Sequence, residues 1–419
     1  MMYKIKVLIA MLLSVPAMAV AQKQPDLVRY ANTLQGTDSN FGLSHGNTFP
    51  ATAMPYGVHV WTPQTNVNGE GFKYLYSHDR IRGFGQSHQC SPWVSDYAVY
   101  TFMPETGRLV VNENDRASKF SHDNEVGRPH YYKVTFDNGI TTEMAPTDRG
   151  VHLRFSYPKG QDAFLVIDGY TDTSEVKIDA KRRQIRGWVR NHRFVNHPEN
   201  FRCYFVVQFD RAFADYGTWE NQNNRTFSRQ TYAKGKGAGV YIKFRPGSKV
   251  QAKAASSYIS YAQAELNLER ELGGDRSLEA TKARGFKVWN NLFNRVRVEG
   301  GTDEDMRTFY SCLFRANLFS RRFYDLDREG KPYYYSPYDG KIHHGYMYTD
   351  NGFWDTFRSQ FPLTNILHPT QQGRYMQAML NVQQKELGWF PAWSCPGETG
   401  GMLGNHAISL FADAFAKGI

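Results

Sequence analysis

The spacing of apolar residues changes its period once along the chain, near residue 261. Before that point apolar and polar residues alternate, as in Val151-His152-Leu153-Arg154-Phe155, which is the period of a half-buried strand. Short apolar runs at 163–167 and 204–207 are separated by turn signals such as Asp137-Asn138-Gly139. Many short strands over about 235 residues predict a large antiparallel β-sandwich domain at 22–261.

Beyond this point apolar residues recur at helical spacing. A helix is predicted at Ala262–Leu272, where Gly273-Gly274 end it, and Ser277 can cap a second helix. These two helices and a short extended piece are expected to form a helical linker at 262–301.

The remaining residues, 302–419, are predicted to be helical. The run Thr302-Asp303-Glu304-Asp305 has the form of a capping box. Further helices are expected at Phe353–Leu367, Gln371–Lys385 and Asn405–Lys417, with aromatic, polar loops at Tyr333–Tyr348 and Trp389–Gly404. Consecutive helices whose connecting loops are rich in aromatic and polar residues indicate a toroid in which these loops build a site. A plain helical bundle fits the apolar spacing equally well.

Residues 1–21 have the pattern of a secretory signal peptide. Lys4 and Lys6 precede an apolar run at Val7–Val20, and Ala17-Met18-Ala19 is a small-x-small cleavage site. The apolar run is too short to span a bilayer, and no Cys follows the cleavage site. We therefore expect a periplasmic or secreted protein without a lipid anchor or membrane partner.

Composition excludes several classes of function. Hydrophobic residues make up 41% and charged residues 21%, which indicates a folded protein. The net charge of +10 comes from scattered basic residues and no nucleic-acid motif is seen, so no nucleic-acid partner is expected. Metal-protease, phosphate-loop and serine-hydrolase motifs are missing too, and no metal ligands are predicted. The four cysteines, which are Cys90, Cys203, Cys312 and Cys395, form no C-x-x-C, so disulfides and free thiols both remain open.

The stretch Tyr348–Arg358 is the first candidate site. Trp354 offers a flat ring beside the charged Asp355 and Arg358, and this combination suits a sugar, with the ring on a C–H face and the charged groups on hydroxyls. Asp355 and Arg358 are three residues apart and can pair along a helix. The alternative is a helix start with a buried Trp and a structural ion pair.

Two loops supply further candidates. The glycine-rich loop Gly388–His406 holds Glu398, a candidate acid or base, and His406, but it also fits a tight interhelical loop with a surface Glu. The loop Gly85–Tyr97 holds Trp93 between turn residues, as a stacking platform or as part of the sandwich core.

Seven ordered motifs carry a resemblance to a known family. They are G-N-T-F-P-A-T-A-M-P-Y-G at Gly46–Gly57, W-T-P-Q-T at Trp61–Thr65, I-R-G-F-G-Q-S-H-Q at Ile81–Gln89, S-P-W-V-S-D-Y at Ser91–Tyr97, V-E-G-G-T at Val298–Thr302, F-W-D-T-F-R at Phe353–Arg358, and P-G-E-T-G-G-M-L-G-N-H-A at Pro396–Ala407. Together they resemble glycoside hydrolase family 92, the exo-acting α-mannosidases, over almost the whole mature chain.

The resemblance implies a β-sandwich, a helical linker and an (α/α)6 toroid that together release terminal mannose from glycans. Hydrolysis in the family inverts the anomeric centre and depends on calcium. By resemblance, Trp354, Asp355 and Arg358 belong to the wall that holds the mannose, and Trp93 reaches the leaving-group side. Glu398 and His406 lie nearby, and the Ser-Pro-Trp loop favours α-1,2 linkages.

The length of the helical part departs from the family pattern. A toroid of twelve helices needs on the order of 400 residues, whereas 115 residues run from Asp305 to Ile419. We expect an incomplete toroid, with the general acid, the general base and most calcium ligands beyond Ile419, and little turnover by this chain. The intact enzyme is expected to be a monomer. The rival hypothesis is a non-catalytic, secreted glycan-binding protein.

Overall fold

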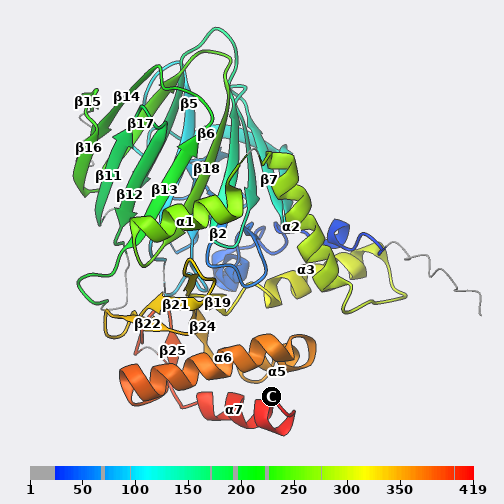
Figure 1. Ribbon diagram of the computed structural model, residues 1–419. Coiled ribbons are helices and arrows are strands. Elements are labelled where there is room, and N and C mark those ends of the chain that lie inside the picture. The colour runs from blue at the N-terminus through cyan, green and yellow to red at the C-terminus, as the bar shows by residue number, and fades with distance from the viewer. Residues whose placement is uncertain are drawn as a thin grey trace, which may run out of the picture.

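The computed structural model describes residues 24–67, 71–94, 96–169, 172–191, 197–221, 226–274, 276–400 and 402–419. The predicted signal peptide at 1–21 lies outside these residues. A large sandwich of two sheets stands over a smaller layer of helices and short strands (Figure 1). Within the described part of the chain, no helix has the length and apolar character needed to cross a membrane.

The sandwich consists of an eight-stranded and a ten-stranded sheet, and the described neighbouring strands in both pair antiparallel. In spatial order the first sheet contains β1 (Thr52–Ala53), β2 (Val60–Gln64), β4 (Gly83–Ser87), β5 (Tyr100–Thr106), β10 (Ala163–Gly169), β17 (Gly239–Phe244), β14 (Asp215–Trp219) and β15 (Phe227–Ser228). The second contains β16 (Tyr232–Lys236), β11 (Thr173–Asp179), β12 (Gln184–Val189), β13 (Cys203–Phe209), β18 (Lys249–Ser257), β9 (Gly150–Ser156), β8 (Thr141–Pro146), β7 (Tyr131–Phe136), β6 (Ser118–Arg128) and β3 (Arg80–Ile81). The predicted antiparallel β-sandwich is confirmed.

Strand β9 shows where the alternating pattern succeeds and where it fails. Val151, Leu153 and Phe155 are buried between the sheets, as their spacing predicts. His152 points to the other face and is nevertheless fully buried, because helix α2 (Leu278–Phe293) covers that face. Its imidazole Nδ1 lies 3.4 Å from the hydroxyl of Thr281 on α2.

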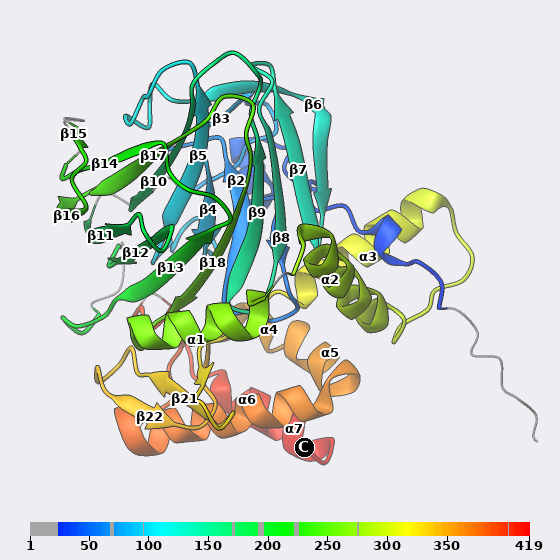
Figure 2. The same cartoon turned by 45° about the horizontal axis from the view of Figure 1, so that its top comes forward.

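Three capped helices follow the sandwich. Helix α1 (Tyr261–Leu272) lies across one end of the ten-stranded sheet, and α2 lies beside it (Figure 2). The Ser277 side chain accepts a hydrogen bond from the backbone of Ala280 at the start of α2. Helix α3 (Asp303–Ala316) begins with the capping box that the sequence predicts, formed by Thr302 and Asp305.

The predicted helix at Phe353–Leu367 is wrong as a single element. It is split into α4 (Phe353–Thr356) and α5 (Gln360–Leu367), because Ser359 has non-helical angles, φ −139° and ψ −70°. The side-chain amide of Gln360 donates to the carbonyl oxygens of Ala316 and Phe319 at the end of α3. These contacts lie far away in sequence, so the local pattern does not contain them.

The remaining helices pack as a small layer. Helices α6 (Pro369–Val382) and α7 (Ala407–Ala416) pack on α5, and the π-helical turn η3 (Gln383–Leu387) follows α6. Within the described residues they do not close a ring (Figure 1). The sequence analysis did not predict the short strands of this layer. The predicted loop Tyr333–Tyr348 contains most of β21 (Pro332–Tyr335), all of β22 (Ile342–His344) and the start of β23 (Tyr348–Thr349). Outside this loop lie β19 (Arg321–Arg322), β20 (Asp325–Leu326), β24 (Asn351–Gly352) and β25 (Trp393–Ser394).

The sandwich and the helical layer share one hydrophobic core. At their junction the rings of Tyr258 and Phe323 lie 4.4 Å apart. A second cluster joins the N-terminal turn η1 (Val28–Tyr30) to α2 and α3, where the indole of Trp289 donates to the carbonyl of Ala53 at 2.8 Å. Shared apolar packing therefore fixes the relative position of the two parts.

Candidate functional site

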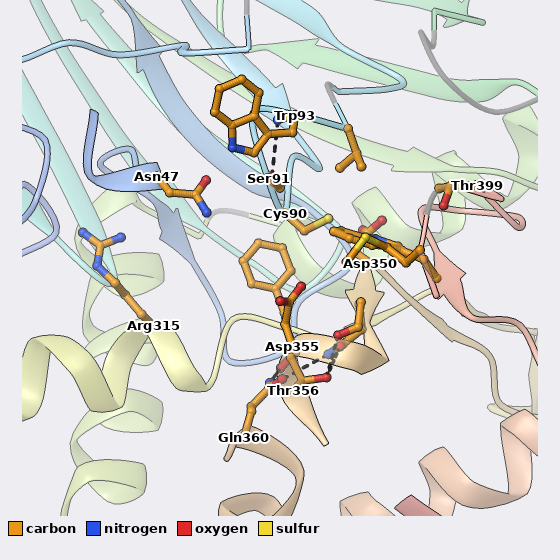
Figure 3. Close-up of a pocket in the computed structure, with 16 residues that line it drawn as sticks. Asn47, Cys90, Ser91, Trp93, Arg315, Asp350, Asp355, Thr356, Gln360 and Thr399 are labelled. Carbon is orange, nitrogen blue, oxygen red and sulfur yellow. Dashed lines mark hydrogen bonds between the residues drawn. The ribbon is translucent and has the colours of Figure 1, made fainter. Parts of the chain in front are cut away.

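A cavity of about 780 Å³ opens between the sandwich and the helical layer. Its lining comes from both parts (Figure 3) and consists of Asn47, Cys90, Ser91, Trp93, Val94, Arg315, Phe319, Asp350, Asn351, Gly352, Asp355, Thr356, Gln360, Trp393, Thr399 and Met402. This volume suits a small ligand.

Trp93 forms the sandwich side of the cavity. It lies on the loop after β4, and 57% of its surface is exposed, so it is not part of the sandwich core. The rings of Phe41 and Phe72 meet it edge-on, with centroids at 6.5 and 5.8 Å. Its backbone N–H donates to the hydroxyl of Ser91 at 3.3 Å. A supported, exposed indole is a stacking platform for the apolar face of a ligand.

Asp350 forms the buried floor of the cavity. Its carboxylate Oδ2 accepts hydrogen bonds from the guanidinium of Arg321 and, at 2.7 Å, from the hydroxyl of Tyr97. Oδ1 is buried too and has no partner among the described residues. Burial raises the pKa of the Asp350 carboxyl, while the neighbouring Arg321 opposes that rise. The floor thus contains a buried acceptor atom that has no partner among the described residues.

The Asp350 backbone is left-handed, with φ of +65°. This conformation is uncommon for a residue with a side chain, although Asp and Asn tolerate it better than most. Such strain often occurs at functional sites, where the surrounding structure holds it.

The helical side of the cavity presents polar groups at the start of α4. The hydroxyl of Thr356 donates to the side-chain oxygen of Asn351 at 2.5 Å, and the Asn351 amide donates to Gln360 at 3.0 Å. These bonds hold Asn351 and Thr356 in place. Asp355 is exposed on the same wall, and none of the ion pairs found among the described residues involves it.

Asp355 and Arg358 do not pair, although their spacing allows it. The Arg358 guanidinium lies over the indole of Trp354, 4.7 Å from the ring centroid, and donates to the Trp354 carbonyl at 3.3 Å. A cation–π contact therefore replaces the expected ion pair and leaves the Asp355 carboxylate free at the cavity.

The six predicted site residues divide into two groups. Trp93 and Asp355 line the cavity. Trp354, Arg358, Glu398 and His406 do not line it. Trp354 is 42% exposed rather than buried, which excludes the alternative of a core Trp at this position.

Glu398 and His406 have structural contacts instead. Both carboxylate oxygens of Glu398 accept backbone N–H groups, from Ala392 at 2.7 Å and from Gly400 at 2.9 Å. The His406 imidazole stacks on Phe357 at 4.5 Å. Glu398 therefore holds its own loop together in this structure, and its charge is already satisfied.

Asp350 and Asn351 are lining residues that the sequence reading did not single out. Both belong to the stretch Tyr348–Arg358, which was selected for its Trp and its exposed charges. Their polar character gave a weak signal. The structure places Asp350 through partners elsewhere in the chain, among them Tyr97, which lies 253 positions away.

Among the residues that the structure describes, one group of side chains could hold a metal ion, and it lies outside the cavity lining. Single ligand atoms of Asp339, His343 and Glu386 lie within 4.8 Å of one another. Calcium prefers oxygen ligands, so an imidazole fits it poorly. The Glu386 carboxylate also accepts hydrogen bonds from Tyr334 and Ser336. This group therefore does not fit a calcium site.

Comparisons with known proteins agree in pointing to one family. The model described as the glycosyl hydrolase family 92 N-terminal domain matches residues 30–257, and that described as the family 92 catalytic domain matches residues 263–419. An uncharacterised secreted glycosidase of Arthroderma benhamiae is 22% identical over 441 residues, which cover 95% of this chain and 50% of that protein.

Solved structures of the same family are similar over nearly the whole chain. A family 92 inverting mannosidase from Bacteroides thetaiotaomicron is 42% identical with a TM-score of 0.91, and the match covers 94% of this chain and 53% of that one. A family 92 α-mannosidase of the same organism is 26% identical with a TM-score of 0.82, over 94% and 55%. The chain spans about half the length of the relatives it matches.

Proposed function

Because the chain belongs to glycosyl hydrolase family 92, we propose that it serves in the inverting hydrolysis of α-mannosides and binds the terminal mannose in the cavity. The substrates are mannose-containing glycans. An α-mannosidase among its structural neighbours has been solved with mannoimidazole, which supports a mannose-like ligand.

The observation that carries this proposal is the pairing of an indole with free carboxylate oxygens across one cavity. Trp93 can cover a C–H face of the sugar, while the exposed carboxylate of Asp355 can accept hydrogen bonds from sugar hydroxyls. In this proposal Asn351 adds a side-chain amide that its hydrogen bonds hold in position. Trp354 and Arg358 do not contact the sugar, and their stacking keeps the first turn of α4 in place.

The reaction needs more than these groups provide. Inverting hydrolysis uses one carboxylic acid and one carboxylate about 6.5–9.5 Å apart. Among the described lining residues the carboxyl groups are Asp350 and Asp355, and Asp350 is committed to Arg321 and Tyr97. We propose that the described residues bind and orient the sugar, and that the 419-residue chain alone has little or no turnover.

Calcium dependence is part of the proposal by family membership. The one described group that could hold a metal does not fit calcium, and no reaction step is assigned to the ion here. If the chain alone binds the sugar through the cavity side chains, chelation of calcium will leave that binding unchanged. In any preparation that does hydrolyse mannosides, chelation of calcium will abolish the hydrolysis.

Binding of mannoimidazole and hydrolysis of an aryl α-mannoside test the proposal together. We expect calorimetry to detect binding, and Trp93→Ala and Asp355→Ala each to weaken it at least about tenfold, a change of about 1.4 kcal/mol. Trp389→Ala is the matched control, because this Trp is half exposed but does not line the cavity. Failure of the purified chain to bind, or equal losses in the control, would refute the site. Hydrolysis at the rate of an intact relative would refute the expected inactivity.

Arg321 and Tyr97 already donate to the carboxylate of Asp350. This also favours a second candidate function, a glycan-binding protein that does not hydrolyse its ligand. Binding without any turnover, even when the chain is supplied with calcium, is the outcome that supports it. In either case we propose that the ligand carries an α-1,2-linked mannose, which competition between α-1,2 and α-1,6 mannobiose would check.

We also propose export to the periplasm or the medium. The predicted signal peptide motivates this, and one relative is described as secreted. N-terminal sequencing of the mature protein after expression with residues 1–21 tests it, since cleavage near Ala21 is expected.

A further inference from the structure

Two thiols from distant parts of the chain meet at the edge of the cavity. The Sγ atoms of Cys90 and Cys395 lie 3.7 Å apart, although the residues are 305 positions apart in sequence. Cys90 follows β4 of the sandwich, and Cys395 follows β25 of the helical layer. The pair therefore joins the two regions that match separate family domains.

The backbone on each side of this pair is already fixed. Arg321 donates to the carbonyl oxygens of Ser87 and His88, just before Cys90, and to the carboxylate of Asp350. The next residue, Asn351, pairs with Ser394, the neighbour of Cys395. A chain of buried polar contacts thus holds the two cysteine segments against each other without help from the thiols.

We propose that Cys90 and Cys395 are a redox pair whose disulfide fastens the loop carrying Trp93 to strand β25. A disulfide needs a sulfur separation of about 2.0 Å, so small rotations of the two side chains must close the remaining gap. Cys90 and Trp93 line the cavity from the sandwich (Figure 3). Trp393 of β25, the strand just before Cys395, also lines it, so the bond would cross-link two parts of the cavity lining. Formation of this disulfide does not depend on the proposed function, whereas the effect of the disulfide on sugar binding does.

The bond forms by exchange with an external disulfide, RS–SR. Cys90 is partly exposed and lines the cavity, so its thiolate attacks first, forms a Cys90–S–S–R bond and releases RS⁻. Cys395 is buried, and contact with Cys90 and burial both raise the pKa of its thiol. Cys395 then passes its proton to the released RS⁻ and attacks Cys90 Sγ, which expels the second RS⁻. Two protein thiols are oxidised and one external disulfide is reduced to two thiols.

The other two cysteines serve as controls. Cys203 is buried in the sandwich, with its Sγ 3.5 Å from the side-chain amide of Gln86. Cys312 is exposed on α3. Cys312→Ser therefore removes an accessible thiol without touching the pair.

The first experiment counts thiols and maps the link in the full chain. After incubation with oxidised glutathione, we expect titratable thiols in denaturant to fall from the four of the sequence to two. The linked peptides should contain Cys90 and Cys395 and be lighter by two hydrogen atoms than their reduced sum. Cys312→Ser should keep this link, and Cys90→Ser and Cys395→Ser should abolish it.

The second experiment measures what the bond does. We expect oxidation to raise the melting temperature of the wild type by roughly 3–8 °C, since it closes a very long loop of the unfolded chain. Cys90→Ser should melt within about 1 °C of the reduced wild type in both redox states. If the proposed function holds, oxidation should also tighten mannoimidazole binding severalfold. A shift in melting without a change in binding would retain the disulfide and argue against the sugar site.

Three results would overturn the proposal. They are four titratable thiols after oxidation, a link that involves Cys203 or Cys312, or a glutathione adduct that stays on Cys90 because Cys395 does not displace it. Should Cys395→Ser not fold, Cys90→Ser at its partly exposed position keeps the test decisive.

Discussion

Buried polar side chains link the sandwich to the elements packed on it. Arg321 is completely buried and connects the carbonyl groups of the Ser87–His88 segment with the carboxylate of Asp350. Removing one partner of such a pair leaves an uncompensated buried charge, which costs about 3–5 kcal/mol. His152 is a comparable case without a formal charge, since the covering helix α2 buries its imidazole against Thr281, while Gln251 of the neighbouring strand lies 3.0 Å away.

This burial predicts an acid sensitivity that can be assigned to His152. Burial first, and then the nearby Lys253, lower the pKa of its imidazole to about 4 from the ordinary 6.5, while Arg154 also lowers it and Glu279 opposes them. Between pH 6.5 and about pH 4 this imidazole therefore binds a proton in the unfolded chain but not in the folded chain. Stability from this group is complete above pH 6.5 and is lost as the pH falls towards 4.

Between pH 7 and pH 5 we expect the free energy of unfolding to fall by about 2 kcal/mol more in the wild type than in His152→Gln. Glutamine retains an amide that can donate to Gln251 but does not titrate. Urea denaturation at both pH values measures the difference. His344→Gln, at an exposed position on β22, is the control and should lose as much as the wild type. Equal losses in all three proteins would show that His152 is not the group responsible.

Elements whose ends are determined locally were predictable, and those determined by distant contacts were not. The helices α1, α2 and α3 agree with the sequence reading because Ser260, Ser277 and Thr302 cap them with their own side chains. The break between α4 and α5 depends on Gln360 reaching the end of α3. The cavity lining follows the same rule. Trp93 and Asp355, which were predicted from local pattern and family resemblance, line it, whereas the position of Asp350 depends on the distant Arg321 and Tyr97.

The capping box of α3 offers a test at this scale. The Thr302 hydroxyl accepts from the Asp305 backbone at 3.2 Å, and the Asp305 carboxylate accepts from the Thr302 backbone at 2.8 Å. Thr302→Ala should lower the free energy of unfolding by about 1 kcal/mol. Thr308→Ala makes the same change at an exposed position inside α3 and should change stability by less than about 0.5 kcal/mol. Indistinguishable effects at the two positions in urea denaturation would mean that the cap contributes nothing.

At the scale of the whole molecule, the two parts are joined by one core and by buried ion pairs. Arg149 of the sandwich donates to Asp325 at 2.8 Å and to the carbonyl of Tyr324 at 2.7 Å. The far side of the helical layer is different. On α7, Ile408 and Phe415 are 60% and 81% exposed, and their spacing of seven residues puts them on one face.

An apolar helix face open to water favours self-association, because burying it against a second apolar surface removes it from solvent. We expect sedimentation velocity of the wild-type chain to show a mass that rises with concentration in the micromolar range. The variant Ile408→Glu/Phe415→Lys should remain monomeric, since it replaces both apolar side chains by charges that also suit the two ends of the helix. The variant Ser409→Glu/Ala416→Lys adds the same charges at exposed positions of α7 and keeps Ile408 and Phe415. If it associates like the wild type, the apolar face and not the net charge is responsible, whereas a wild type that stays monodisperse at every concentration would show that this face does not drive association.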